Sequence, residues 1–278
     1  RVPRYDNYYN LTAVHCGTGL ARLATMGDGW LEHCTSLTVL DCSGLTQLAT
    51  VGHNWLCSCT KLTAVDCTGL TELATVGDLW LCQCTSLTAL DCSGLGQLAT
   101  VGHSWLRDCG NLRSLDCSGL TQLATIGDLW LCGCTHLTAL DCSGLRRLTR
   151  VGRCWLRDCT SLTVLKFEAV CSGVTQLTTV GDNWLRGCTK LTALGNAGVT
   201  LLTTIGDFWL FQCTSLTALD CTGLRQLATV GHSWLHGCSS LTALDCSGLS
   251  QLATVGGGWL YQCTSLTALD CTVPVSSV

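Results

Sequence analysis

Cysteine is the residue whose chemistry most needs an explanation in this chain. It occurs 24 times in 278 residues. Ten copies follow a tryptophan by four residues: Cys34, Cys59, Cys84, Cys109, Cys134, Cys159, Cys188, Cys213, Cys238 and Cys263. Nine end a short apolar segment: Cys16, Cys42, Cys67, Cys92, Cys117, Cys142, Cys221, Cys246 and Cys271. Thiols repeated in this way could cross-link the chain, bind a metal ion or fill a core.

The two regular cysteine rows are best explained as small apolar side chains that point inward. The alternative is a disulfide from each post-tryptophan cysteine to the cysteine eight residues later. That pairing is disfavoured, because Cys159 remains where its partner position holds Phe167. In the same way, Cys188 remains opposite Asn196.

Five further cysteines fall outside the rows, and two of them suggest a different cross-link. Cys57 and Cys82 hold the same position in consecutive units. Neighbouring parallel strands lie roughly 4.8 Å apart, which is within reach of a disulfide. We therefore predict that these two side chains point outward and form a disulfide between units. A zinc site is not predicted, because the C-x-C pairs lack the spaced histidines or second C-x-x-C that would complete a tetrahedron.

Aspartate precedes the segment-ending cysteine in most units, and this row is a candidate ligand face. Such stacked carboxylates could attract a cation such as Ca²⁺ or a basic partner, or they could bond nearby hydroxyls and backbone and remain hydrated. Threonine occupies the second position of the same segment, so both residue types are expected on one face. The charged row argues against the ice-binding role that regular threonines can have. The candidate ligand residues are Asp41, Asp66, Asp91, Asp116 and Asp141.

A second polar row follows a repeated glycine, where aspartate alternates with a base along the first six units. Aspartate there is suited to cap the first turn of a helix. An adjacent histidine would relieve the repulsion of a pure aspartate row and add some pH sensitivity. The row runs Asp28, His53, Asp78, His103, Asp128, Arg153, Asp182, Asp207, His232 and Gly257.

All these rows follow from one repeat of about 25 residues. Units open at Leu11, Leu37, Leu62, Leu87, Leu112, Leu137, Leu162, Leu191, Leu216 and Leu241, and an eleventh opens at Leu266. A fixed period of this size predicts a solenoid in which each unit buries its apolar face against its neighbours. In LTALDC, positions 1, 4 and 6 are expected to point inward. A second short strand, QLATV, then precedes a glycine and one or two turns of α- or 3₁₀-helix at W-L-x-x-C. The predicted fold is mainly β with short helical turns, in about ten units.

This repeat resembles the leucine-rich repeats of the BspA-like (Treponema pallidum) type, over roughly residues 11–271. That family shows L-x-x-I-x-[IL]-P, then a strand ending in I-G, then A-F-x-x-C. The corresponding residues here are Leu62, Val65 and Cys67, then Val76 and Gly77, then Trp80, Leu81 and Cys84. The chain departs from the pattern by Trp-Leu for Ala-Phe, by Cys for the last aliphatic residue and by the missing proline, and it is similar in this to protist surface proteins. The resemblance implies adhesion or recognition at a cell surface.

Composition excludes several classes of function. Charged residues make up 12% of the chain, about half of the usual 25%, so the surface is expected to need a cover of glycans, a partner or further copies. There is no basic stripe for nucleic acid and no apolar run long enough for a membrane span. The one N-x-[ST] sequon places a possible N-glycan at Asn10. We expect an extracellular or cell-surface location and no cofactor.

The two ends of the chain suggest a mode of assembly. We divide the chain into an N-terminal arm (1–10), a solenoid (11–265) and a terminal half-repeat with its tail (266–278). Neither end shows the polar cap that solenoids need, and an open strand edge is a template for pairing. A head-to-tail contact that does not close gives a filament. The predicted interface comprises Tyr5, Tyr8, Tyr9, Leu266, Leu269 and Cys271.

The leading hypothesis is therefore a structural extracellular protein that assembles head-to-tail into a fibril. The alternative is a surface adhesin or recognition module that binds a protein or glycan on its strand face. A third explanation of the open ends is that the chain is part of a longer repeat protein. No catalytic set or phosphate loop stands out, so we do not expect an enzyme.

Overall fold

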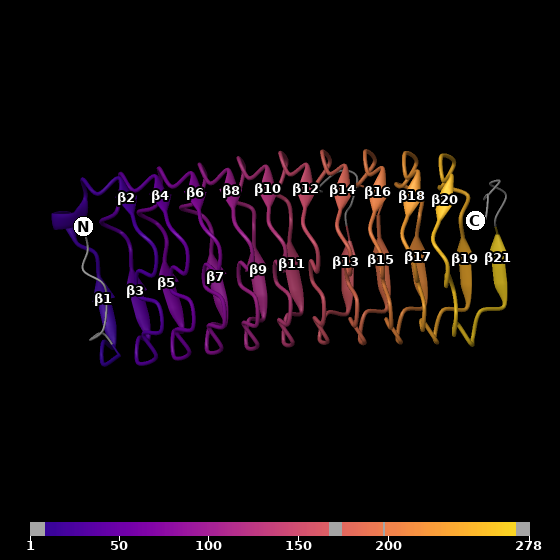
Figure 1. Ribbon diagram of the computed structural model, residues 1–278, viewed down its shortest axis with the longest axis horizontal. Coiled ribbons are helices and arrows are strands. Elements are labelled where there is room, and N and C mark those ends of the chain that lie inside the picture. Colours follow the sequence, from indigo (N-terminus) through magenta and orange to yellow (C-terminus); the bar gives the residue numbers. More distant parts are fainter. Residues whose placement is uncertain (1–8, 167–173, 197, 271–278) are drawn as a thin grey trace.

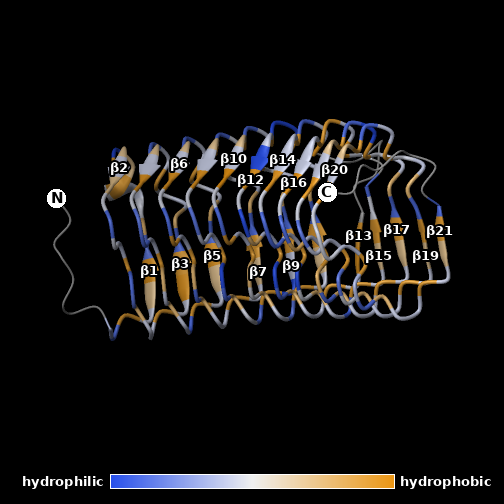
Figure 2. Ribbon diagram, turned by 45° about the vertical axis from the view of Figure 1, so that its right-hand side comes forward, coloured by the Kyte–Doolittle hydropathy of each residue, from blue (hydrophilic) through white to orange (hydrophobic). Residues whose placement is uncertain are grey.

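The structure is a computed structural model that describes residues 9–166, 174–196 and 198–270. These residues form a long solenoid in which each unit contributes two short strands, one to each of two sides (Figure 1). Each strand pairs in parallel with the equivalent strand of a neighbouring unit. Figure 2 shows from a second angle that the strands of successive units lie side by side along the whole length. The predicted mainly β solenoid of about ten 25-residue units is confirmed.

The odd-numbered strands come from the LTALDC segments and form one side of the coil. They pair in register in the groups β1-β3-β5, β7-β9-β11, β13-β15-β17 and β19-β21. Their bounds are β1 (Ala13–His15), β3 (Val39–Asp41), β5 (Ala64–Asp66), β7 (Ala89–Asp91), β9 (Ser114–Asp116), β11 (Ala139–Asp141), β13 (Val164–Lys166), β15 (Ala193–Gly195), β17 (Ala218–Asp220), β19 (Ala243–Asp245) and β21 (Ala268–Asp270). We call the outer surface of these strands the odd-strand face.

The even-numbered strands form a second, uninterrupted parallel sheet of ten strands. They are β2 (Thr25–Met26), β4 (Thr50–Val51), β6 (Thr75–Val76), β8 (Thr100–Val101), β10 (Thr125–Ile126), β12 (Arg150–Val151), β14 (Thr179–Val180), β16 (Thr204–Ile205), β18 (Thr229–Val230) and β20 (Thr254–Val255). In each strand the second residue is buried and the first faces out. We call the outer surface of this sheet the even-strand face.

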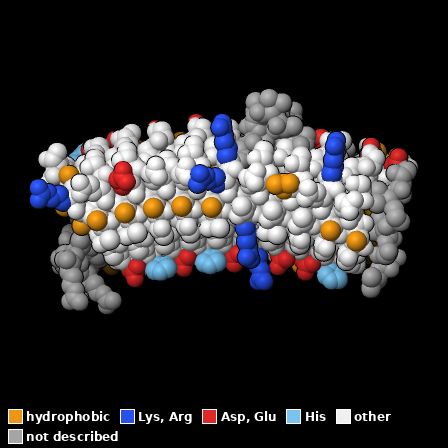
Figure 3. All heavy atoms as spheres, turned by 90° about the horizontal axis from the view of Figure 1, so that it is seen from above, with side chains coloured by type: hydrophobic (Ala, Val, Ile, Leu, Met, Phe, Trp, Pro, Cys, Tyr) orange, Lys and Arg blue, Asp and Glu red, His pale blue; other side chains and the backbone are white. Residues whose placement is uncertain are grey.

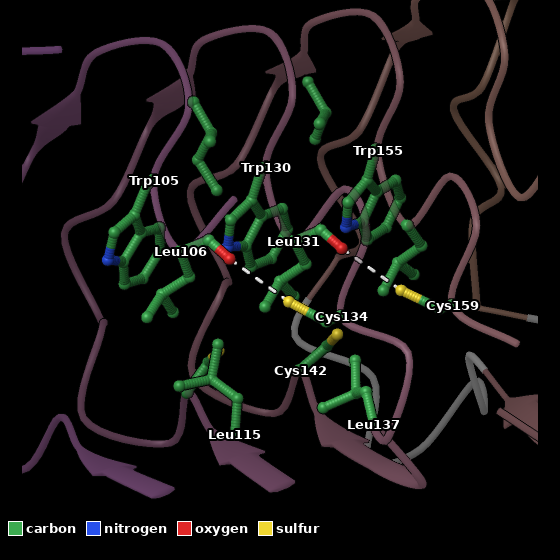
Figure 4. Close-up of a cluster of buried hydrophobic side chains, with 14 of the residues drawn as sticks. Trp105, Leu106, Leu115, Trp130, Leu131, Cys134, Leu137, Cys142, Trp155 and Cys159 are labelled. Carbon is green, nitrogen blue, oxygen red and sulfur yellow. Dashed lines mark hydrogen bonds between the residues drawn. The ribbon is translucent and has the colours of Figure 1, made fainter. Parts of the chain in front are cut away.

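The core between the two faces is built from stacked identical residues. From Trp55 to Trp259, neighbouring indole centroids lie 5.3–5.6 Å apart with interplanar angles of 2–6° (Figure 4). The inward positions of the first strand are confirmed, since Leu62 and Cys67 are buried with Val65 between them. Repetition of one unit therefore gives ladders of like side chains at fixed spacing.

The post-tryptophan cysteines from Cys34 to Cys238 are buried as predicted, and those from Cys59 onward also donate hydrogen bonds. The Cys134 thiol donates to the Leu106 carbonyl, and the Cys159 thiol to the Leu131 carbonyl, each at 3.1 Å (Figure 4). Burial raises the pKa of Cys109 to about 12, so the buried thiol stays protonated. Each of these cysteines joins its own unit to the preceding one.

The segment at W-L-x-x-C, expected as one or two helical turns, consists of consecutive turns instead. Alternate residues have positive φ, for example Asn54 at 62°, Leu56 at 57° and Ser58 at 61°, and this conformation costs non-glycine residues roughly 1–2 kcal/mol each. Hydrogen bonds between units offset the cost: Leu56 N–H donates to the Trp30 carbonyl of the preceding unit, and Ser58 N–H to the Cys82 carbonyl of the next. Within the described residues the one helix is the 3₁₀ turn η1 (Thr18–Leu20).

Candidate ligand-binding faces

The aspartates of the odd-strand face accept hydrogen bonds from backbone N–H groups two residues further along the chain. Asp116 Oδ1 accepts the Ser118 N–H at 2.8 Å, and Asp66 Oδ1 accepts both the N–H and the hydroxyl of Thr68, at 2.9 and 2.6 Å. The same turn forms at Asp41, Asp91, Asp141, Asp220 and Asp245. Hydrogen bonds from Ser43, Ser118 and Ser247 hold the pKa of Asp41, Asp116 and Asp245, respectively, below the ordinary value. These carboxylates shape the turn after each strand, and their role as a ligand face stays a prediction.

The threonines of the odd-strand face are also bonded within the molecule. The Thr63 hydroxyl donates to the Thr38 carbonyl at 3.0 Å, and the Thr217 hydroxyl to the Thr192 carbonyl at 3.1 Å. Each bond joins a unit to the one before it. On this face the aspartate row therefore shapes the turn within each unit, and the threonine row joins neighbouring units.

The threonines of the even-strand face differ from them. They are Thr25, Thr50, Thr75, Thr100, Thr125, Thr179, Thr204, Thr229 and Thr254, and all are exposed or half-buried. Their hydroxyls make no hydrogen bond with any residue in the described part of the chain. This row thus offers hydroxyl donors and acceptors without a partner in the described residues, one in each of nine units. The sequence analysis did not single it out, although its spacing was visible in QLATV.

The row of alternating aspartate and histidine borders the even-strand face (Figure 3). Asp28 Oδ1 accepts the His53 N–H of the next unit at 2.8 Å, and His53 Nδ1 in turn accepts the Asp78 N–H at 3.0 Å. The predicted helix cap is therefore wrong: the acceptor serves the next unit, because the segment that follows is no helix. The expected contact between neighbours is present, with 3.3 Å between His53 Nδ1 and Asp78 Oδ2.

A groove lies midway along this surface, where Arg150 replaces threonine in the row of even-strand threonines. A groove of about 770 Å³ there is lined by Arg150, Arg153, Thr179, Asp182 and Thr204, among others. Figure 3 shows arginine or lysine side chains midway along the border of aspartates and histidines. Arg150 is the one residue of its phase that is not threonine, and that irregularity was a signal available in the sequence.

The structure places Cys57 and Cys82 differently from the prediction. Both are buried, with 7% and 2% of their surfaces exposed, rather than pointing outward. They lie here as thiols, and a hydrogen bond from the Cys82 thiol lowers the pKa of Cys57. The segment is a series of turns bonded to both neighbouring units rather than the expected helix, so the outward direction expected for these side chains does not apply. The disulfide between them stays a prediction.

The same phase of the repeat carries aromatic side chains in the C-terminal units, a feature that the sequence analysis missed. The Phe211 and His236 rings stack with centroids 4.6 Å apart, and Tyr261 follows at 5.0 Å. The Arg186 guanidinium lies 5.0 Å from the Phe211 centroid. The rings cover one another, so they mainly stabilise the stack of units.

The residues predicted for assembly and glycosylation lie partly outside the described region. Tyr9 and Leu269 are 56% and 46% exposed, Leu266 packs partly against the core, and Asn10 is exposed. Tyr5, Tyr8 and Cys271 lie outside the described residues. In the part that is described, no helix is long and apolar enough to cross a membrane. Over the same residues, no group of three or more His, Cys, Asp or Glu side chains is placed to hold a metal ion.

The repeat matches a known family of leucine-rich repeats. A family profile for the BspA type leucine rich repeat region (6 copies) matches residues 70–192 and 174–278. No curated protein sequence gives a significant match. The chain is similar to a solved leucine-rich repeat protein from Bacteroides ovatus, with 14% identity over 91% of this chain and 87% of that one and a TM-score of 0.37. It is also similar to a leucine-rich repeat protein of T. pallidum, with 18% identity over 83% and 78% and a TM-score of 0.42.

A further similar structure is the functional domain of InlJ from Listeria monocytogenes, which includes a cysteine ladder. It shows 23% identity over 94% of this chain and 63% of that one, with a TM-score of 0.33.

Proposed function

Because the chain belongs to the BspA-type leucine-rich repeat proteins, we propose that it is a non-enzymatic recognition module that binds a glycan or protein at a cell surface. Proteins of this family commonly act at cell surfaces. The observation that carries the proposal is the line of threonine hydroxyls on the even-strand face that have no hydrogen-bond partner in the described part of the chain. A ligand can use these groups without breaking any bond of the fold.

The shape of this face favours an extended ligand. Ten strands follow one another without interruption, at roughly 4.8 Å per strand. Nine of them present an outward threonine and β12 presents Arg150. A polymer with hydroxyl or amide groups at regular intervals can bond to several units at once. Many weak contacts of this kind add up through effective concentration.

Charge substitutions on the two faces test the proposal. In one variant Thr100→Glu and Thr229→Glu introduce charges on the even-strand face, and in a matched variant Ala89→Glu and Ala243→Glu introduce them on the odd-strand face. All four positions lie on strands, and both variants add two negative charges. Labelled protein is then bound to intact cells and to an immobilised panel of glycans.

We expect the even-strand variant to lose binding at least tenfold and the odd-strand variant to bind as the unsubstituted protein does. Loss in the odd-strand variant alone would contradict the assignment, and would move the ligand to the face of Asp41, Asp66, Asp91, Asp116 and Asp141. Unchanged binding in both variants would exclude both strand faces.

A second candidate function is head-to-tail self-assembly, and the exposure of the last described strand favours it. Leu269 on β21 is 46% exposed, whereas the equivalent Leu244 on β19 is 2% exposed. A second copy that continued the ladder would cover this apolar edge. Electron microscopy and light scattering of the pure protein at several concentrations test the idea. We expect unbranched fibrils that Leu269→Lys and deletion of residues 1–10 abolish, and monodisperse protein at every concentration would overturn it.

A further inference from the structure

We propose that the groove around Arg150 binds the carboxylate of an acidic sugar chain that runs along the even-strand face. This inference rests on the recognition function proposed above and adds a ligand class and a site. The groove, of about 770 Å³, is within the usual size range of ligand sites. It is large enough for a few sugar rings.

Arg150 supplies the attraction for an anion. It lies in register with Thr125 on one side and Thr179 on the other, so it stands in the middle of the free threonine row. Its side chain is exposed and makes no hydrogen bond or ion pair with the described residues. A free guanidinium offers donors in a fork that matches a carboxylate.

The other charged groups of the groove are already engaged. Arg153 Nε lies 3.3 Å from Asp182 Oδ2, and Asp182 Oδ1 accepts the Asp207 N–H at 3.1 Å. Asp128 Oδ1 accepts the Arg153 N–H at 2.8 Å. Asp182 offsets Arg153, and Asp128 Oδ2 lies 3.6 Å from His103 Nδ1. Arg150 is the arginine of the groove that has no partner among the described residues. A densely charged polyanion such as nucleic acid would meet these carboxylates, whereas a chain with one carboxylate per few sugars would not.

The surroundings of Arg150 suit sugar hydroxyls. The hydroxyls of Thr179 and Thr204 have no hydrogen-bond partner among the described residues, and they lie one and two strands further along the same row. Gly152, Gly181 and Gly206 also line the groove, and a Cβ at any of them would collide with the preceding unit. An extended sugar chain can therefore place its carboxylate on Arg150 and its hydroxyls on the adjoining threonines.

The chain offers two substitutions that separate this site from general charge. Arg150→Thr restores the residue of nine other units, and Arg147→Gln restores the residue found at Gln47, Gln97 and Gln122. Both remove one positive charge from the same unit, but Arg147 does not line the groove. The probes are a hyaluronan decasaccharide, which carries one carboxylate per disaccharide, and neutral chitohexaose, each titrated by calorimetry at physiological salt.

We expect Arg150→Thr to weaken hyaluronan binding at least tenfold and Arg147→Gln to change it less than twofold, with weaker binding as salt is raised. Equal loss in the two variants, no loss in either, or equal binding of chitohexaose would overturn the assignment. Absence of any hyaluronan binding would also overturn it. In that case cell binding that still depends on Thr100 and Thr229 would leave the recognition function intact.

Discussion

The two strand faces arise from one repeat, yet their polar side chains do different things. On the odd-strand face, Asp116 bonds the Ser118 N–H and Thr63 bonds the Thr38 carbonyl. On the even-strand face, the hydroxyls of Thr100 and its counterparts make no hydrogen bond in the described part of the protein. Regular spacing of polar residues is thus a poor guide to a ligand site. In a solenoid, a repeated polar row can also serve to form hydrogen bonds with backbone groups. A polar row is a better candidate for a ligand site when its side chains make no hydrogen bonds within the protein.

The largest effect should come from the core that both faces share. Trp130 is fully buried between stacked neighbours, so Trp130→Ala should cost about 3–5 kcal/mol of unfolding free energy. Tyr261→Ala is the matched control, because that ring is 60% exposed and its loss should cost less than 1 kcal/mol. Urea unfolding followed by circular dichroism measures both. Equal losses would mean that the stack contributes no more than an exposed ring.

A smaller but sharp effect is expected where the odd strands turn. A Cβ at Gly94 would collide with the Cys67 carbonyl and the Thr68 backbone of the preceding unit, whereas one at Gly96 would meet only the Gly119 carbonyl oxygen, 3.9 Å away. Gly94→Ala should therefore destabilise the protein by about 2–3 kcal/mol, and Gly96→Ala by almost nothing. The urea midpoints of the two variants give the answer. If they coincide, the units are not packed as closely at this turn as the structure shows.

The aspartates of the odd-strand face should contribute stability through hydrogen bonds rather than through charge. A triple variant with Asp66→Ala, Asp91→Ala and Asp116→Ala loses three acceptors of backbone N–H groups. At roughly 0.5–1 kcal/mol each, the loss should total about 2 kcal/mol in urea unfolding. The triple Asn variant keeps the acceptor and removes the like charges, so it should match or exceed the unsubstituted protein. A destabilised Asn variant would show instead that the negative charge itself is needed.

Acid should weaken the same face. The pKa of Asp41, Asp116 and Asp245 is held below its ordinary value by hydrogen bonds from serine. A group with a depressed folded-state pKa stabilises the fold above its unfolded pKa, near 3.9, and loses that contribution as pH falls through the folded pKa. Thermal midpoints should therefore fall more steeply below about pH 4 in the unsubstituted protein than in a variant with Asn at these three positions. Parallel curves would argue against this linkage.

The sequence predicted most of the fold, because periodicity depends only on which side chains must be inward. Leu62, Val65 and Cys67 were placed correctly by spacing alone. The segment after Trp55 was not predicted, because positive φ at Leu56 is intrinsically unfavourable and is stabilised by bonds to other units. Because this segment was expected to be a helix, Cys57 was predicted to point outward and Asp78 was predicted to cap a helix. Cys57 is buried instead, and Asp78 accepts a hydrogen bond from the His103 N–H of the next unit.

The candidate site was harder to predict, because a bonded and an unbonded threonine look alike in a sequence. Thr63 and Thr100 each recur at a 25-residue period. Only the structure shows that one hydroxyl has a carbonyl partner and the other has none among the described residues. Arg150 was visible in the sequence as the exception in a row of threonines. Its assignment as an anion site also needed the groove around it and the ion pair of the neighbouring Arg153 with Asp182, which only the structure shows.

The smallest expected effect tests the comparison most directly, since it changes the same residue type on both faces. Thr63→Val removes a hydroxyl that bonds the Thr38 carbonyl and should cost about 0.5–1 kcal/mol. Thr100→Val removes a hydroxyl without a partner in the described chain and should change the unfolding free energy by less than about 0.5 kcal/mol. Valine is close in shape to threonine and suits a strand equally well, so packing differs little between the variants. Ligand binding should show the opposite order, with loss for Thr100→Val and none for Thr63→Val. If Thr100→Val destabilised the fold as much as Thr63→Val, the even-strand hydroxyls would be structural, and the line of free groups proposed to hold a ligand would not exist.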